Sequence, residues 1–254
     1  MWTALVVILV SVAITVVAFL LFGRSRAHEQ ADDRDSDSRG FLGAVISGLF
    51  IVALAFYMVI VWEESGTAED NAAREAAAIA DAYWQTTVMP QPQRDHIRGL
   101  LTEYPKLVAD KEWPRLAVGE PDERTTETLS SLHSEILGLP TTPDQVKSAR
   151  ERALERVRDI TDLRRDRLDQ AGGLDHTGKL MLFGTLAGAV CMIVFPMLIG
   201  FTARVRHILQ MIVMAALLAF VCVLCVQLDQ PFSGVLRVQP EAFVSVAEEL
   251  AGIP

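Results

Sequence analysis

The stretch FLGAVISGLFIVALAFYMVIVW, residues 41–62, decides the fold class of this chain. Its 22 residues include no Asp, Glu, Lys, Arg or His. A helix of roughly 20 apolar residues, at about 1.5 Å per residue, spans a hydrocarbon core about 30 Å thick. We therefore expect this stretch to cross a membrane as a helix.

Three further uncharged runs occur in the 254-residue chain, and they lie at residues 2–22, 180–201 and 208–226. The first run has its positive charges, Arg24 and Arg26, after the apolar segment, whereas a signal peptide carries them before it. We interpret this run as a retained span. The sequence thus predicts an all-α integral membrane protein with four transmembrane helices.

The spans divide the chain into four predicted parts. Residues 1–62 form a transmembrane hairpin, residues 63–177 a helical extramembrane domain, residues 178–226 a second transmembrane hairpin, and residues 227–254 a C-terminal interfacial tail. In the helical domain we expect helices over residues 68–89, 92–113, 122–137 and 142–172, the last one capped by Thr142. The final helix, which starts at Pro240, should lie along the membrane or dock on the helical domain.

Arginine in the short loops predicts the orientation. The loop between the first two spans carries Arg24, Arg26, Arg34 and Arg39, and short loops rich in Lys and Arg stay in the cytoplasm. The helical domain and both termini should then be extracytoplasmic, although the arginine-rich segment before the third span opposes this orientation. The excess of 19 Arg over 4 Lys suggests a GC-rich bacterial genome, and hence a bacterial plasma membrane.

The charged residues exclude several classes of function. Residues 63–176 contain 23 acids and 15 bases, which argues against binding to nucleic acid. The five histidines are scattered, and no nucleophile, phosphate-binding or metal-binding motif is present, so we expect neither an enzyme nor a cofactor or metal site. Asp110 and Glu112 are two neighbouring acids that we interpret as solvated surface residues. Cys222 and Cys225 should serve packing within a span.

Small residues in the spans predict close contacts between helices. Gly43 with Ser47, and Gly184 with Gly188, have the four-residue spacing that lets helix backbones approach. These pairs could serve packing within one subunit or a subunit interface.

The chain leaves its last span through LDQPFSG, residues 228–234, followed by VQPEAF, residues 238–243. Asp229, Pro231, Phe232 and Gly234 in this exit resemble a bacterial bestrophin-like membrane protein family of unknown function. The Glu112–Trp113 pair and the RRDRLDQA run before the third span also resemble this family, and the likeness extends over nearly the whole chain. We interpret the exit motif as structural: Asp229 should cap or pair at the membrane surface, and Phe232 should wedge between the spans and the helical domain.

The resemblance implies a likeness to bestrophin anion channels, but it assigns no residue to permeation. It leads to the hypothesis of an oligomeric channel for small anions. The second span would line the pore, with Phe50, Leu54 and Tyr57 as the constriction. Alternatively, these three residues face lipid or neighbouring helices. A second hypothesis is a non-catalytic accessory or scaffold subunit of a larger membrane complex. Partners of the chain would then be the lipid bilayer and either further copies of itself or the other subunits of a complex.

Overall fold

The computed structural model describes residues 33–173, 176–199, 205–228, 231–233 and 237–253. The described residues form helices and no β-strand, which confirms the predicted all-α class. The first predicted span, Asp229 and Gly234 lie outside the described residues.

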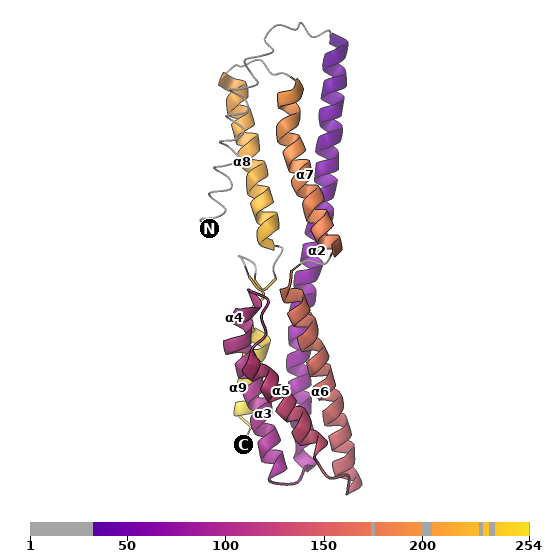
Figure 1. Cartoon of the computed structure of the whole chain (residues 1–254), viewed down its shortest axis with the longest axis vertical. Coiled ribbons are helices and arrows are strands. Elements are labelled where there is room, and N and C mark those ends of the chain that lie inside the picture. The colour runs from indigo at the N-terminus through magenta and orange to yellow at the C-terminus, as the bar shows by residue number, and fades with distance from the viewer. Residues whose placement is uncertain (1–32, 174–175, 200–204, 229–230, 234–236, 254) are drawn as a thin grey trace. The chain divides into compact units, whose positions relative to one another are not determined.

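Within the described part of the chain, three helices are long and apolar enough to cross a membrane, judged by length and composition. The predicted second and fourth spans lie in α2 (Asp33–Gln85) and α8 (Val205–Leu228), and the predicted third span lies in α7 (His176–Ile199) as far as residue 199 (Figure 1).

Helix α2 continues from its apolar half into its polar half, where we expected a new helix to begin near Ala68. Residues 63–67 contain no proline, and one interior glycine, Gly66, costs only about 1 kcal/mol relative to alanine. The hydroxyl of Thr67 donates to the carbonyl oxygen of Glu63 at 2.8 Å, within the same helix. Nothing in this sequence therefore ends the helix.

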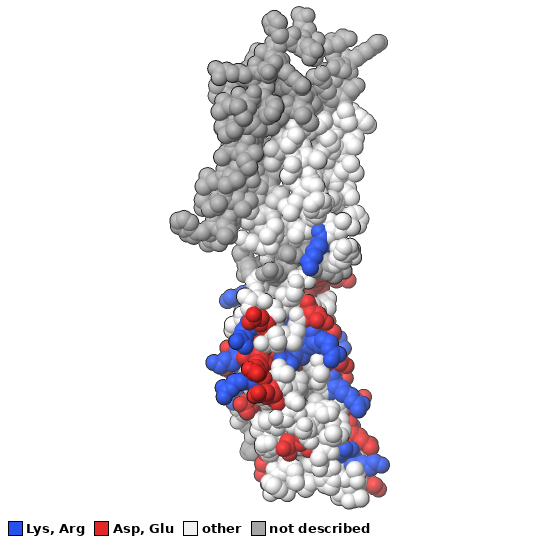
Figure 2. All heavy atoms as spheres, viewed as in Figure 1, with Lys and Arg blue, Asp and Glu red and all other residues white. Residues whose placement is uncertain are grey.

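The packing of the chain separates two compact units. The membrane unit comprises Met1–Trp62 and Leu174–Asp229, and the helical domain comprises Glu63–Gly173 and Gln230–Pro254. The C-terminal segment thus belongs to the same unit as the helices between the second and third spans. On the face shown in Figure 2, acidic and basic atoms gather over the helical domain.

In the membrane unit, aromatic rings pack onto glycines. A Cβ added at Gly188 of α7 would come 3.1 Å from the ring of Phe50 in α2. A Cβ added at Gly43 of α2 would come 3.1 Å from the ring of Phe195 in α7. These contacts explain why two small residues lie in this part of the chain: a larger side chain would push the two helices apart.

The helical domain has one apolar core, shared by the polar half of α2 with α3 (Gln93–Leu107), α5 (Glu123–Leu137), α6 (Asp144–Ala171) and α9 (Glu241–Ala251). Short elements complete it: η1 (Thr86–Val88), η2 (Val108–Glu112) and α4 (Trp113–Leu116). Fully buried core residues include Ile79, Leu101, Leu132, Ile160 and Phe243. Of the two placements considered for the last helix, the structure has α9 docked on α3.

One helix of the domain has a side-chain cap in the structure, whereas the cap that the sequence predicted for another helix is absent. Asp122 caps α5, because its carboxylate accepts the backbone N–H of Thr125 at 3.1 Å. The cap expected from Thr142 is wrong: α6 begins after Pro143, with no side-chain cap. Proline has no N–H and a fixed φ, so it suits the start of a helix without help from a capping side chain.

Candidate functional site

A network of buried ion pairs lies inside the helical domain. Arg167 of α6 donates from Nε and Nη2 to the two carboxylate oxygens of Glu75 in α2, at 3.0 Å each. Its third nitrogen, Nη1, donates to Glu112 at 2.9 Å. The side chains of Glu75 and Glu112 are fully buried, and that of Arg167 is 1% exposed. Arg167 therefore joins two carboxylates from different elements.

Arg164, one helical turn before Arg167, completes the network. It donates from Nε to both oxygens of Glu112, at 3.1 and 3.2 Å, and from Nη2 to the same carboxylate. Nη2 also donates to the hydroxyl of Thr126 at 2.8 Å. The backbone N–H of Asp122 adds a further hydrogen bond to Glu112 at 3.3 Å. Glu112 is thus held by two guanidinium groups and one backbone amide.

Tyr104 of α3 binds to the network through its hydroxyl, which donates to Glu75 at 2.7 Å. Burial, together with the negative charge of Glu75, raises the pKa of Tyr104 well above its usual value. Burial alone would lower the pKa of Arg167, but the two carboxylates outweigh it and raise that pKa. Both groups therefore keep their protons over the physiological range.

The network is electrically balanced, since two arginines face two glutamates. Replacing such a buried network by apolar residues is often neutral for stability, whereas removing one partner strands a buried charge. In the part of the chain that the structure describes, no group of three His, Cys, Asp or Glu residues could hold a metal ion. We interpret the network as a positioning device for α2, η2 and α6, because it joins these three elements.

Aromatic rings cover one side of the network. The indole N–H of Trp113 donates to the carbonyl oxygen of Val238 at 3.1 Å, and its ring meets Phe232 edge-on at 5.3 Å. The guanidinium of Arg167 lies 5.6 Å from the centre of the Trp113 ring and 5.3 Å from that of Phe243. The exit segment of the chain is thus fastened to the network through Trp113.

A π-helical turn places Glu112 and Trp113 in this arrangement. Helix α3 contains Pro105, which cannot donate to the carbonyl one turn earlier, and Pro114 follows in α4. Between them, the chain forms the π-helix η2. A π turn inserts one residue into the helical repeat and so changes which residues face the core. Both members of the sequence pair are buried as a result.

The structure places the motif residues in the helical domain as far as it describes them. Glu112, Trp113, Pro231 and Phe232 are all buried. The surface interpretation of Glu112 is wrong, because the residue is fully buried between two arginines. Asp229 and Gly234 lie outside the described residues, so the proposed roles of these two positions stay predictions.

The residues predicted for a constriction lie on one face of α2. Phe50 and Tyr57 are buried, and Leu54 between them is half-buried. Phe50 packs with Ala189 and Leu218 of α7 and α8. The Tyr57 hydroxyl donates to the carbonyl oxygen of Cys225 in the last turn of α8. In one chain, this face of α2 therefore contacts the neighbouring helices.

The predicted packing residues differ in what they touch. Gly43 and Gly188 contact phenylalanine rings, as described above. The Ser47 hydroxyl donates to the carbonyl oxygen of Gly43 at 2.8 Å and lies 3.3 Å from the sulfur of Met192. A Cβ added at Gly184 would meet no atom of another described residue within 4 Å. Three of the four residues thus serve contacts within the chain, while no described residue lies against Gly184.

The opposite face of α2 is exposed and apolar along the span. Its residues recur every three or four positions, and they are Val45, Gly48, Val52, Phe56 and Val59. The exposed fractions of Phe56 and Val59 are 61% and 62%, so nothing within the described chain covers them.

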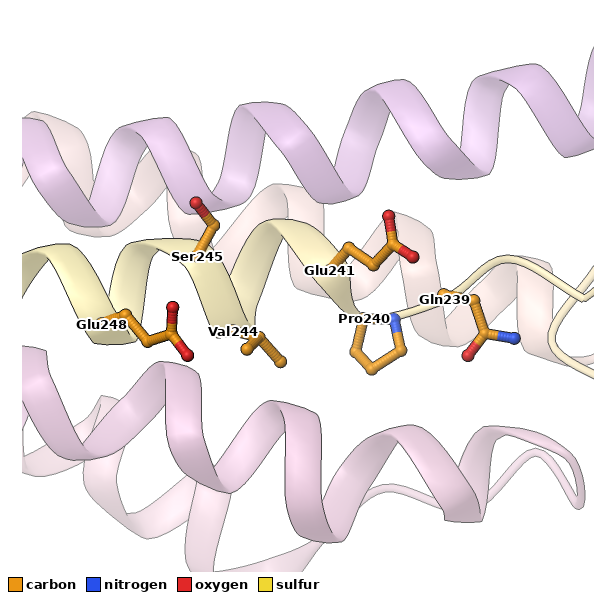
Figure 3. A pocket seen from close by; sticks show the side chains of 6 residues that line it. All are labelled: Gln239, Pro240, Glu241, Val244, Ser245 and Glu248. Carbon is orange, nitrogen blue, oxygen red and sulfur yellow. The ribbon is translucent and has the colours of Figure 1, made fainter.

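A hollow lies on the outer side of α9, lined by Gln239, Pro240, Glu241, Val244, Ser245 and Glu248 (Figure 3). A second hollow lies beside α5 and includes His96, Glu127 and Glu135. Both are open to solvent, and neither is lined by a buried polar side chain. They have the character of hydrated surface and not of a ligand site.

Sequence reasoning missed Glu75, Arg164 and Arg167 as network members. A usable signal was present in the helix periodicity. Arg164 and Arg167 continue the stripe of buried positions that runs through α6, and Glu75 takes a core position in α2. Charged residues at such positions indicate buried pairing, because an unpaired buried charge is very costly.

The sequence profile of the bestrophin-like domain family matches residues 9–243 of this chain. Two crystal structures of single-substitution variants of a bacterial bestrophin homologue from Klebsiella pneumoniae are similar in fold. The first, at 14% identity, covers 98% of this chain and 99% of the other, with a TM-score of 0.64. The second, at 11% identity, covers 98% and 97%, also with a TM-score of 0.64. No curated protein matches the chain. The match over most of its length confirms the resemblance seen in the sequence, and the chain belongs to the bestrophin-like family.

Proposed function

We propose that this protein is a homo-oligomeric membrane channel for small ions in a bacterial plasma membrane. The observation that carries the proposal is the apolar face of α2 that no other described residue covers, in a chain that belongs to the bestrophin-like family. The resemblance to bestrophin anion channels supports conduction. The specific prediction of an anion rests on that resemblance alone.

A ring of copies would enclose a pore if the uncovered face of α2 faced its axis. Val52, Phe56 and Val59 would then form an apolar constriction, which gates ions by expelling water. Phe50 and Tyr57 already contact α7 and α8, so lining the pore would require α2 to turn about its axis. We therefore propose that the face with Val52, Phe56 and Val59 forms the constriction. The alternative is a constriction formed by Phe50, Leu54 and Tyr57, and the experiment below distinguishes the two.

Cysteine accessibility separates the two faces of α2. In a background with Cys191, Cys222 and Cys225 replaced by Ala, single cysteines are introduced at Phe56 or at Tyr57. A water-soluble thiol reagent should block the current through bilayers with Phe56→Cys and leave Tyr57→Cys unaffected. Block of Tyr57→Cys alone would move the constriction to the other face. Absence of conductance above that of empty bilayers, over a range of salts, would remove the channel.

The second candidate is a non-catalytic accessory or scaffold subunit. The helical domain favours this candidate. Among its described residues, the buried charges are paired, and the two hollows are open to solvent. Such a domain suits contact with another protein better than chemistry. Gentle solubilisation followed by mass spectrometry tests this candidate, since a homo-oligomer that purifies without another protein would count against it.

We also propose that the helical domain is extracytoplasmic, on the basis of the arginine-rich loop before the second span. A membrane-impermeant maleimide tests this orientation on intact cells, with Ser131→Cys as the labelled position in the cysteine-free background. Residue 131 is exposed on α5. Labelling without lysis is expected, and labelling only after lysis would reverse the orientation.

A further inference from the structure

The last part of the chain folds back onto the buried ion network. We call residues 231–233 and 237–253 the C-terminal strap. Its two pieces are joined by the backbone N–H of Val238, which donates to the carbonyl oxygen of Pro231 at 2.8 Å. The strap belongs to the same compact unit as Glu63–Gly173, although α7 and α8 separate the two in sequence. It is therefore a separate piece of chain that completes the helical domain.

Trp113 is the residue on which both pieces of the strap meet. Its indole N–H donates to the carbonyl oxygen of Val238 at 3.1 Å, and its ring meets Phe232 edge-on at 5.3 Å. A third ring, that of Phe243 in α9, has its centre 5.7 Å from the centre of the Trp113 ring. All three aromatic side chains are buried. The strap is thus fastened to Trp113 by one hydrogen bond and two ring contacts.

Trp113 and the strap keep water away from Arg167. The guanidinium lies 5.3 Å from the centre of the Phe243 ring and 5.6 Å from that of Trp113, and the Arg167 side chain is 1% exposed. An ion pair is much stronger in such dry surroundings than in water, because the effective dielectric constant is lower. The strength of the bond between Arg167 and Glu75 therefore depends on the strap staying in place.

Glu75 is the point at which the network holds α2. Both of its carboxylate oxygens accept hydrogen bonds from Arg167 of α6, at 3.0 Å each. Helix α2 contains the predicted second span, and the strap follows α8, which contains the predicted fourth span. The strap, the network and α2 thus link the ends of two predicted spans through contacts inside the helical domain.

We infer that the C-terminal strap is a releasable lid on the ion network, and that its release loosens the polar half of α2. With the strap in place, Trp113 and Phe243 keep the pair of Arg167 and Glu75 dry. When the strap lifts, water reaches the guanidinium, the ion pair weakens, and α2 separates more easily from α6. Opening of the strap and local opening of α2 are therefore one event. This conformational device belongs to the helical domain and does not depend on conduction.

The strap is suited to open before the rest of the domain. Helix α9 has 11 residues, and isolated helices shorter than about 12 to 15 residues are marginal in water, so its docking holds it in helical form. Segments of this kind open locally at a lower free energy than the core of a domain, and amide hydrogen exchange detects these openings.

Hydrogen exchange of the purified full-length protein tests the inference. Trp113→Phe removes the hydrogen bond to Val238 and keeps an aromatic ring. Loss of one hydrogen bond should increase the opening of the strap about fivefold. The amides of α9 and those of α2 at residues 72–79 should then exchange faster by the same factor. The amides of α5 at residues 129–136 should keep the parental rate.

Two further variants accompany this measurement. Trp84→Phe is the matched control, because it makes the same change at a tryptophan of α2 that is 52% exposed. It should leave all three segments at the parental rate. Phe243→Leu removes the ring beside Arg167 and keeps much of the apolar bulk, so it should give the same pattern as Trp113→Phe.

Three results would overturn the inference. Faster exchange in α9 alone would show that the strap opens without loosening α2. Equal acceleration in α9, α2 and α5 would show a general loss of stability in place of a local opening. Unchanged exchange in α9 of Trp113→Phe and Phe243→Leu would show that these rings do not hold the strap. Bilayer recordings decide separately whether the protein conducts, so neither answer depends on the other.

Discussion

Replacing Arg167 by Met should destabilise the helical domain by about 3 to 5 kcal/mol, the usual cost of removing one partner from a buried ion pair. Arg167 supplies both charged contacts to Glu75, at 3.0 Å each, and one of the contacts to Glu112, at 2.9 Å. After the substitution, the hydrogen bond from Tyr104 is the one that the buried Glu75 carboxylate retains among the described residues. Methionine keeps much of the apolar bulk, so the effect reports the stranded charge.

The assay is the melting temperature of the purified protein in detergent. In chains of about 150 to 250 residues, 1 kcal/mol corresponds to about 2 to 4 °C, so the expected decrease is about 6 to 20 °C. Adding Glu75→Gln to Arg167→Met should recover part of the loss, because an amide replaces the unpaired carboxylate. The matched control is Arg165→Met: its side chain is 69% exposed and its ion pair with Asp162 is 3.6 Å long. This control should change stability by less than about 0.5 kcal/mol.

Two results would refute this reasoning. If Arg167→Met melted like the parent, the network would not hold the helical domain together. If Arg167→Met and Arg165→Met lost the same stability, loss of positive charge in general would explain the effect.

Burial raises the pKa of Tyr104 well above 10.0, so at high pH the folded protein keeps a proton that the unfolded chain loses. The free energy of unfolding should therefore fall as the pH rises above about 10. In melting curves recorded over a range of pH, Tyr104→Phe should make this fall less steep. Phe232→Ala should lower the free energy of unfolding by about 3 to 5 kcal/mol, because the ring is buried against Trp113. The control, Val244→Ala, changes an exposed residue and should have little effect. Equal melting temperatures for the two variants would contradict the structural role of the exit motif. Gly188→Leu should lower the free energy of unfolding by about 1 to 3 kcal/mol, because the new side chain collides with Phe50. Gly184→Leu should leave the stability of the single chain unchanged. If Gly184→Leu nevertheless prevented oligomerisation, Gly184 would lie at a subunit interface.

The spans could be predicted from the sequence because a membrane demands long uncharged runs. The predicted span at residues 41–62 lies inside α2, and the later runs lie largely in α7 and α8. The helix predicted over residues 122–137 agrees with α5 to within one residue. The continuity of α2 was missed, because Gly66 and the polar residues around it only permit a break and do not impose one.

The candidate site was less predictable, because its contacts join distant parts of the chain. Glu75 and Arg167 are 92 positions apart, and Glu112 and Arg167 are 55 apart. A prediction from sequence places charged residues at the surface. This rule is correct for most charged residues, but it fails where several charges are buried together as ion pairs. The sequence singled out Phe232 in the exit motif, and the structure shows that its ring packs against Trp113.

The native mass of the purified protein tests the proposed channel most directly, because a ring around α2 requires several copies of one chain. The account predicts a single assembly whose mass is a whole multiple of 27.9 kDa, with no other protein present. A monomer, or a stoichiometric complex with a different protein, would contradict it.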